Sequence, residues 1–388
     1  MKKILNLVMC SLLTILLSGC WDAEELEGMY YVHALGVDYV DNEYEVYLQI
    51  VNFQSSPGTG EQQGGGGSGS EIEVGKARGK TALEAIHHLY PSTQRRVFWG
   101  HLSGIVFTER MMEHGIEEVL DSIDRYREIK PTLWTFTTSE SLHELLVITP
   151  ILEMNTIFSF LGDPEKSYQQ SSLVEPIQEY QFLSVLREPG KTLILPHFSI
   201  TRSDWKNNLG ETKENLNISS ASLMSDSHYK GVLEHNEMLG IRWIQRAAQR
   251  ALLVVPDSEG KPLASVTLNT EKVKIKPHID EEGVTFSIDI KVSGDVSVLQ
   301  EDKKLNELVQ SAKEQIINEV EETYKKGLEI DADVYSFSNA LYKENPQEWK
   351  KLTEKNELPL TEESLQEVNV KVVIDTTGLE KYRPPGAP

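Results

Sequence analysis

The first twenty residues constrain this chain more than any other segment. Lys2 and Lys3 form a short basic head, and an apolar run from Ile4 to Leu17 follows it. A run of this length is too short to cross a bilayer and matches the hydrophobic core of a secretory signal peptide. We therefore predict that residues 1–19 are a signal peptide and that the rest of the chain folds outside a membrane.

The residues that close this segment, Leu17-Ser18-Gly19-Cys20, resemble the lipobox of bacterial lipoproteins. In that pattern the cysteine sulfur receives a diacylglyceryl group, and the cysteine becomes the first residue of the mature protein. The alternative is an ordinary secretory signal with a chance cysteine. The resemblance predicts lipidation at Cys20, where two acyl chains would give stable anchoring. We expect no cofactor beyond this diacylglyceryl lipid.

Cysteine content and charge extend this prediction. Cys10 and Cys20 are the 2 cysteines, and Cys10 would be removed with the signal peptide, so no internal disulfide is expected. The formal net charge of −22 disfavours nucleic acid, and the sequence shows no dense basic stripe. An anionic bilayer would also repel a folded chain of this net charge. The anchor is therefore expected to be its sole membrane element.

Apolar patterning predicts an α+β fold with several domains, each a mixed sheet flanked by helices. Alternating residues predict a strand at Tyr44–Phe53, and the run Val32–Val37 predicts its neighbour, joined to it by a turn near Asp41. The low-complexity segment 55–70 is expected to be a flexible, disordered loop that leads to a third strand at Ile72–Lys76. The loop would therefore join two strands of one domain.

Two helices have clear sequence signals. Thr81 and Glu84 have the spacing of a capping box and predict a helix that ends by Tyr90. Apolar residues at helical spacing predict a long helix from about Asp302 to Lys326. Further helices are expected over Glu109–Arg127, Ser139–Ile148, Leu152–Leu161, Ile177–Leu186, Asn236–Ala247 and Val334–Asn345, the last stopped by Pro346. Further strands are expected over Gly104–Thr108, Pro131–Thr138, Gly190–Ser199, Ile218–Met224, Ala251–Val255, Val273–Pro277, Thr285–Ser293 and Val368–Ile374.

The domain boundaries follow from these elements. A polar stretch with Asn207, Asn208 and Gly210 predicts a linker at this point of the chain. We expect an N-terminal α+β domain over 20–148, a small middle domain over 149–202, the linker over 203–217, a C-terminal α+β domain over 218–379 and a disordered tail over 380–388.

Motifs for catalysis and metal binding are weak. Three residues separate Gly75 from Gly79, one fewer than a phosphate loop needs before its Gly-Lys-Thr. His87 and His88 would point about 100° apart on a helix and do not readily share a metal ion. Ser68 lacks the strand and helix that flank a nucleophile elbow. We therefore expect neither an enzyme nor a metal site.

Three stretches of sequence together resemble one family. The first stretch contains Gly19-Cys20-Trp21-Asp22 and Gly36-Val37-Asp38. The second contains Arg95-Arg96-Val97-Phe98-Trp99-Gly100-His101 and Arg127-Glu128-Ile129-Lys130-Pro131-Thr132. The third contains Asp333-Val334-Tyr335, Pro346-Gln347-Glu348-Trp349 and Val368-Asn369-Val370-Lys371-Val372. They resemble the Ger(x)C lipoproteins, the C subunits of spore germinant receptors. Departures from the usual family pattern lie at Glu237–Trp243 and at Ser336-Phe337-Ser338.

This resemblance implies a function that composition does not. Such proteins are lipid-anchored on the outer face of the inner spore membrane. They act with two integral-membrane subunits, one transporter-like, in a complex that responds to small nutrient germinants. The implied fold has three domains, and no catalytic activity is implied. The competing hypotheses are an extracytoplasmic solute-binding lipoprotein, with a deep cleft between domains, and an extracytoplasmic hydrolase, with convergent acids or histidines in a pocket.

The second of these stretches supplies the candidate partner interface. Arginine and aromatic residues are enriched at interface hot spots, which favours an exposed patch. The alternative is that the same residues are core and turn residues. The candidate interface residues are Arg95, Arg96, Phe98, Trp99 and His101.

Overall fold

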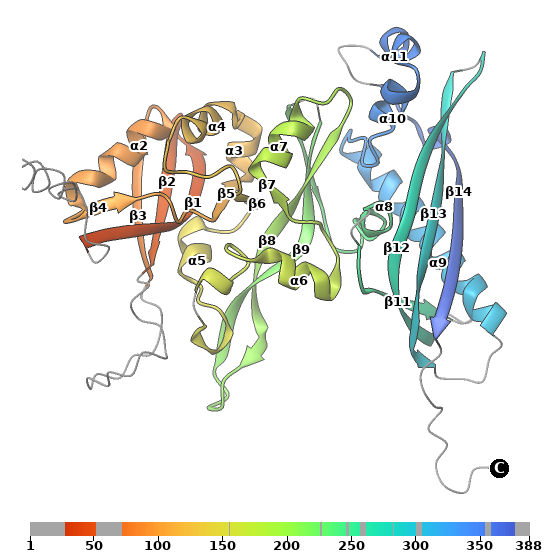
Figure 1. Ribbon diagram of the computed structural model, residues 1–388, viewed down its shortest axis with the longest axis horizontal. Coiled ribbons are helices and arrows are strands. Elements are labelled where there is room, and N and C mark those ends of the chain that lie inside the picture. The colour runs from red at the N-terminus through yellow and green to blue at the C-terminus, as the bar shows by residue number, and fades with distance from the viewer. Residues whose placement is uncertain are drawn as a thin grey trace, which may run out of the picture.

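The computed structural model describes residues 28–51, 72–154, 156–225, 227–245, 248–256, 261–281, 283–299, 305–353 and 358–376. The predicted signal peptide, Cys20, the loop 55–70 and the tail 380–388 lie outside these ranges. Two β-sheets with flanking helices follow one another along the long axis of the molecule (Figure 1). The predicted α+β, multi-domain class is confirmed.

The first sheet has ten strands in the order β10-β9-β8-β6-β5-β1-β2-β3, with β4 added beside β1 and β7 beside β6. Strands β1, β5 and β6 are parallel neighbours at its centre, and β2 and β3 extend it antiparallel. The bounds are β1 Met29–Val40, β2 Glu43–Val51, β3 Ile72–Gly79, β4 Arg96–Phe98, β5 Gly104–Thr108, β6 Trp134–Thr138, β7 Ile177–Gln178, β8 Thr192–Lys206, β9 Thr212–Ser225 and β10 His228–Leu233.

The first three strands form as expected. Asp41 and Asn42 both have positive φ, at 54° and 62°, which is the backbone that a two-residue hairpin turn needs. Strand β2 pairs with β3 from Tyr44 opposite Gly79 to Val51 opposite Ile72. The segment between β2 and β3 therefore joins two strands of one sheet.

Helices cover both faces of the first sheet. Thr81 Oγ1 accepts a hydrogen bond from the backbone N–H of Glu84 at 3.1 Å, so the predicted helix start is confirmed. The single helix expected over Glu109–Arg127 is two helices, because Gly115 with φ of 109° interrupts it. The bounds are α2 Ala82–Leu89, α3 Glu109–His114, α4 Glu117–Asp124, α5 Leu142–Val147, α6 Pro164–Ser171 and α7 Glu179–Leu186, with 3-10 turns at Tyr90–Ser92, Ile151–Glu153 and Thr156–Phe158.

The segments expected as N-terminal and middle domains form one sheet and share its hydrophobic core. Strands β6 and β8 pair at Thr137 opposite His197 and at Thr138 opposite Phe198. Thr137 Oγ1 lies 3.1 Å from His197 Nδ1 and 2.7 Å from Ser222 Oγ. Burial lowers the pKa of His197 to about 4, so this imidazole is neutral at neutral pH. A buried polar cluster thus lies where β6 pairs with β8.

The linker expected over 203–217 is instead the far end of a long hairpin. Strands β8 and β9 stay paired out to Lys206 opposite Thr212. Asn207 Oδ1 accepts hydrogen bonds from the N–H groups of Leu209 and Glu211, each at 2.9 Å. Gly210 supplies a φ of 83°. The residues that suggested a linker therefore close a tight turn, and the prediction is wrong.

The second sheet has four strands in the order β11-β12-β13-β14, and the long helix α9 packs on one face of it (Figure 1). The predicted long helix is confirmed over its described residues. Pro346 stops the predicted helix as expected, since α10 ends at Glu344 with Asn345 as its C-cap. The same proline opens a further helix, α11, at a position where proline is tolerated. The bounds are β11 Ala251–Pro256, β12 Pro262–Ile279, β13 Val284–Leu299, β14 Leu365–Thr376, α8 Ile241–Ile244, α9 Leu305–Glu329, α10 Phe337–Glu344, α11 Pro346–Leu352 and a 3-10 turn at Glu362–Ser364.

A buried ion pair ties α8 to α9 beneath this sheet. The helix expected over Asn236–Ala247 is reduced to the single turn of α8, which carries Arg242 and Trp243. Arg242 Nη2 donates to Glu319 Oε2 at 2.8 Å, and Trp243 Nε1 donates to the same oxygen at 2.7 Å. The side chains of Arg242 and Glu319 are only 7% and 8% exposed. The sequence motif that departs from the family pattern is therefore part of the core.

Candidate partner-docking surfaces

The two arginines of the predicted interface lie on the surface at the start of β4. Strand β4 pairs parallel with the start of β1, with Arg96 opposite Met29. Arg96 Nη2 donates to Glu128 Oε1 at 2.6 Å, and the other oxygen of Glu128 accepts from the backbone N–H of Trp99 at 3.1 Å. Arg95 and Arg96 line an open hollow of ≈ 400 Å³. Their exposure is compatible with a docking role.

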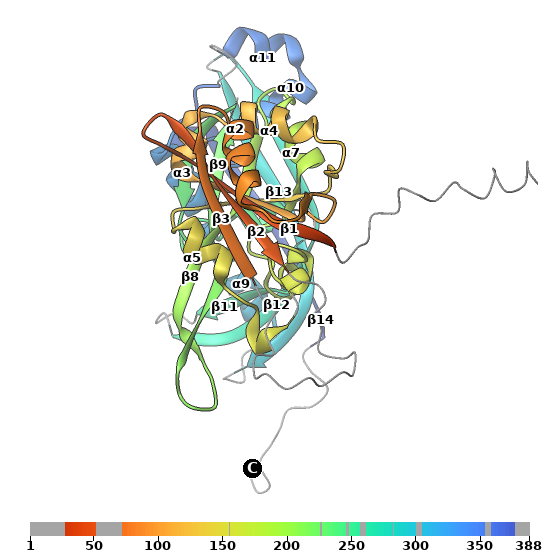
Figure 2. The ribbon, with the colours of Figure 1, turned by 90° about the vertical axis from the view of Figure 1, so that its left-hand side faces the viewer.

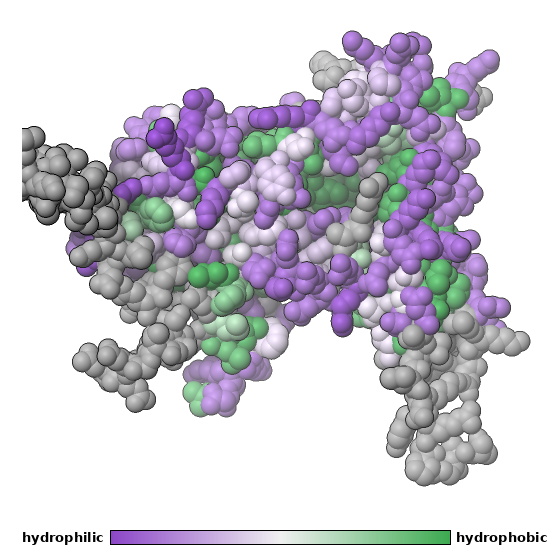
Figure 3. All heavy atoms as spheres, viewed as in Figure 1, coloured by the Kyte–Doolittle hydropathy of each residue, from purple (hydrophilic) through white to green (hydrophobic). Residues whose placement is uncertain are grey.

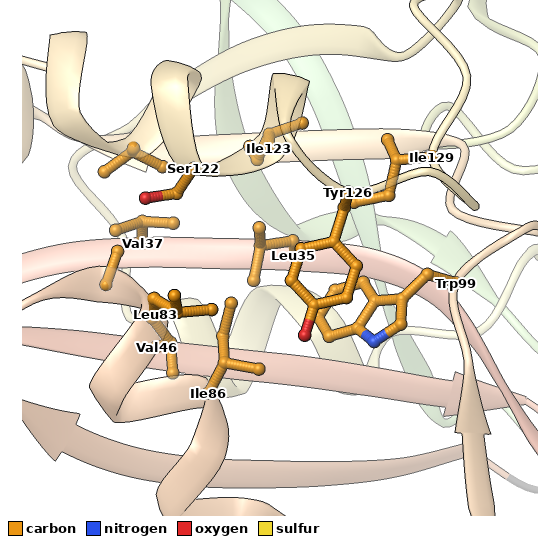
Figure 4. A pocket seen from close by; sticks show the side chains of 12 residues that line it. Leu35, Val37, Val46, Leu83, Ile86, Trp99, Ser122, Ile123, Tyr126 and Ile129 are labelled. Carbon is orange, nitrogen blue, oxygen red and sulfur yellow. The ribbon is translucent and has the colours of Figure 1, made fainter.

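Trp99, in contrast, belongs to the core. Its side chain is 2% exposed, and its Nε1 donates to the hydroxyl of Tyr90 at 3.2 Å. Figure 4 shows Trp99 beside Tyr126 among apolar side chains from β1, β2, α2 and α4. The space left between these side chains is ≈ 10 Å³, about enough for one water. Trp99 borders the same hollow as the arginines, but its side chain is too buried to form an exposed patch. The apolar space in Figure 4 is too small for a ligand.

Phe98 and His101 form a separate aromatic group with Tyr31. The ring centroids of Phe98 and Tyr31 are 5.9 Å apart, and those of His101 and Tyr31 are 5.1 Å apart, both edge to face. A Cβ atom at Gly100 would lie 2.5 Å from the ring of Phe98, so any larger residue there would displace this ring. Burial lowers the pKa of His101. The five predicted interface residues therefore do not form one exposed patch. Arg95 and Arg96 are exposed at the hollow, Trp99 is buried, and Phe98 and His101 pack against Tyr31.

These placements give a first prediction. Trp99→Ala should lower the free energy of unfolding by about 3–5 kcal/mol, because it removes a large buried side chain. Chemical denaturation of the purified protein measures the loss. Arg95→Ala is the matched control on the neighbouring surface and should change stability by less than about 0.5 kcal/mol. An unfolding curve of Trp99→Ala that overlaid the parent curve would contradict the buried position of the indole.

A second candidate surface, which sequence analysis missed, follows α5. Leu152, Phe158 and Met154 are 86%, 62% and 51% exposed, and Val147 and Ile157 are also exposed. We call Val147–Phe158 the apolar segment. Figure 3 shows hydrophobic side chains gathered in this region, below α5 in the same view as Figure 1. Exposed apolar clusters of this kind mark interaction sites.

Local backbone geometry holds this segment out of the core. Leu152 has a φ of 60°, in the left-handed region that a leucine rarely adopts. The segment folds as two 3-10 turns, Ile151–Glu153 and Thr156–Phe158, where we expected a short helix over Leu152–Leu161. A helix would have allowed one apolar face to turn inward. The sequence shows the apolar residues but not their outward direction.

The residues considered for chemistry have other contacts. His88 Nδ1 lies 2.7 Å from the carbonyl oxygen of Arg78, and the ring of His87 packs edge to face on Tyr90. Within the described ranges, no group of three or more His, Cys, Asp or Glu side chains could hold a metal ion. None of the described helices is long and apolar enough to cross a membrane.

Comparison with known families covers most of the chain. Residues 22–200 match the spore germination protein N-terminal domain, and residues 219–378 match the C-terminal domain described as spore germination B3/GerAC like. The chain belongs to this spore germination family. The predicted family is therefore confirmed, and the two matched regions leave out part of strand β9.

Relatives in Bacillus subtilis (strain 168) agree with this assignment. Spore germination protein KC is 25% identical over 97% of this chain and 97% of its own length. Spore germination protein B3 is 23% identical over 81% of this chain and 79% of its own. The crystal structure of the GerBC protein matches 89% of this chain and 97% of that chain with a TM-score of 0.50 and 16% identity, which supports the fold.

Proposed function

We propose that this protein is a non-catalytic, lipid-anchored subunit of a spore germinant receptor. It is held by a diacylglyceryl group on Cys20 at the outer face of the inner spore membrane. There it acts with two integral-membrane subunits, one transporter-like, in the assembly or signalling of the response to small nutrients. The observation that carries this proposal is the match of both family domains across 22–200 and 219–378. The lipobox-like sequence at Cys20 supports the anchor.

Co-purification tests this proposal. A tagged chain extracted in detergent from spore membranes is expected to bring two integral-membrane subunits with it, one of them transporter-like. An untagged strain is the control for proteins that bind the resin. If the chain is recovered alone from membranes that contain both subunits, the receptor role is wrong. The conclusion would then be an extracytoplasmic solute-binding lipoprotein, and ligand screening would follow.

The apolar segment is the docking surface that we assign to the membrane subunits. Leu152, Met154 and Phe158 of this segment are more exposed than Phe98 or Trp99. Interfaces place such side chains at the centre of the contact, where burial contributes most to affinity.

The corresponding variant is Leu152→Ser with Phe158→Ser. Since truncation of a hot-spot residue costs about 2 kcal/mol or more, the pair should weaken retention of the membrane subunits by more than about tenfold. Quantitative co-purification measures this loss. Leu209→Ser at the hairpin tip is the matched control, because Leu209 is 76% exposed and lies outside the segment. Unchanged retention in the double variant would remove the segment from the interface.

A further inference from the structure

The outward face of the second sheet carries a cluster of lysines. Inward residues of its strands, such as Ile288, Ile290 and Val370, join the core with α9. Side chains alternate along a strand, so the residues between these point to the opposite face. That face presents Lys272, Lys274 and Lys276 from β12, Lys291 from β13 and Lys371 from β14, which we call the lysine face.

Strand register brings like charges into one row. Lys272 lies opposite Lys291, and Lys291 lies opposite Lys371. Neighbouring strands are about 4.8 Å apart. Like charges directly opposite one another destabilise a sheet, and lysine is depleted in strands. The core requires apolar residues on the inner face but does not require lysines on the outer one. Stability therefore does not explain this row.

Nearby acids neutralise only part of this charge. Lys291 forms an ion pair with Glu271, and Lys276 forms one with Asp289. Among the described residues, Lys272, Lys274 and Lys371 form no ion pair. All five lysines of the lysine face line an open hollow of ≈ 460 Å³. A concentrated positive surface thus lies on a chain whose formal net charge is −22.

We propose that the lysine face binds the headgroups of anionic phospholipids. The inference rests on the membrane location in the proposed function, since a lipid-anchored body stays within reach of a bilayer. Figure 1 shows β1, which follows the predicted anchor, and β14 toward opposite ends of the long axis, and Figure 2 shows the start of β1 and β14 on the same side of the molecule. Basic clusters near an anionic membrane are attracted to it over about a Debye length. The lysine face therefore orients a body that the same membrane would otherwise repel.

Vesicle flotation tests this proposal without the lipid anchor. All described helices and strands lie within residues 28–376, so the chain that starts at Trp21 keeps them and carries no acyl group. We expect it to float with vesicles rich in phosphatidylglycerol and not with pure phosphatidylcholine vesicles. Binding should fall as salt concentration rises, because the attraction is screened. Equal binding to both lipids, or no binding to either, would overturn the inference.

Charge-matched variants identify the surface. The triple variant Lys272→Glu, Lys274→Glu and Lys371→Glu should reduce binding to anionic vesicles by more than about tenfold. The control triple variant, Lys166→Glu, Lys206→Glu and Lys350→Glu, changes net charge equally at exposed positions elsewhere. Equal losses in both variants would mean that net charge alone acts and would overturn the proposal.

Two further outcomes separate the alternatives. Binding to polyglutamate without binding to vesicles would assign the lysine face to an acidic protein partner and reject the lipid. Normal co-purification with the membrane subunits combined with no flotation would reject this inference and leave the proposed function intact. Flotation with anionic vesicles but no co-purified membrane subunits would support lipid binding by the lysine face and reject the proposed receptor role.

Discussion

Replacing Glu319 with leucine is expected to lower the free energy of unfolding by about 3–5 kcal/mol. The change leaves the guanidinium of Arg242 buried without its carboxylate, and it also removes the acceptor of the Trp243 indole N–H. Arg242 Nη1 keeps only its hydrogen bond to the carbonyl oxygen of Leu252, at 3.0 Å. An uncompensated buried charge is among the largest single destabilising effects. Denaturant titration at neutral pH measures the loss.

Two variants control this experiment. Arg242→Met combined with Glu319→Leu removes both charges and should recover much of the lost free energy of unfolding. Two apolar side chains of similar size can replace a buried ion pair without leaving a charge uncompensated. Glu322→Leu lies on the same helix but breaks an exposed pair with Lys325, 3.3 Å away, and should cost less than about 1 kcal/mol. A similar small cost for Glu319→Leu would show that Arg242 reaches solvent.

Local patterns in the sequence were sufficient for much of the fold. The turn at Asp41, the cap at Thr81 and the apolar stripe of α9 each depend on residues within one or two turns of chain. Each was predicted and is confirmed. Such signals are readable because the interacting residues are close in sequence.

The predictions from sequence were wrong where a residue's structural role depends on contacts with residues far away in the sequence. Residues 203–217 have the composition of a linker, and only their pairing across the β8–β9 hairpin shows that they are strands. Likewise Trp99 resembles an interface residue until Tyr90 and Tyr126 are placed around it. Composition does not distinguish a polar turn from a linker, or a buried indole from an exposed one.

The lysine face shows the same limit for charge. Alternation along Lys272–Lys276 places three lysines on one side of a strand, which the sequence alone could have indicated. Lys291 and Lys371 join them only through the register of β13 with its two neighbours. Our expectation that no dense basic stripe exists therefore holds for the linear sequence and is wrong for the folded surface.

Cys20→Ala should have the largest effect on location. The variant should incorporate no labelled fatty acid, and its processed form should leave the membrane fraction in a high-salt wash that does not release the parent protein. Two acyl chains hold a protein stably, whereas electrostatic contacts are screened by salt. The nutrient response of spores should weaken in parallel, because the chain is no longer concentrated beside its partners.

Cys10→Ala is the matched control, since Cys10 lies within the predicted signal peptide and its loss should leave lipidation and retention unchanged. Mass spectrometry of the N-terminus separates true retention from an uncleaved signal peptide. If processed Cys20→Ala protein resists both high salt and the triple change Lys272→Glu, Lys274→Glu and Lys371→Glu, then neither the acyl group nor the lysine face holds it. Retention at low salt that the triple change removes would instead show that the lysine face binds the membrane once the anchor is gone.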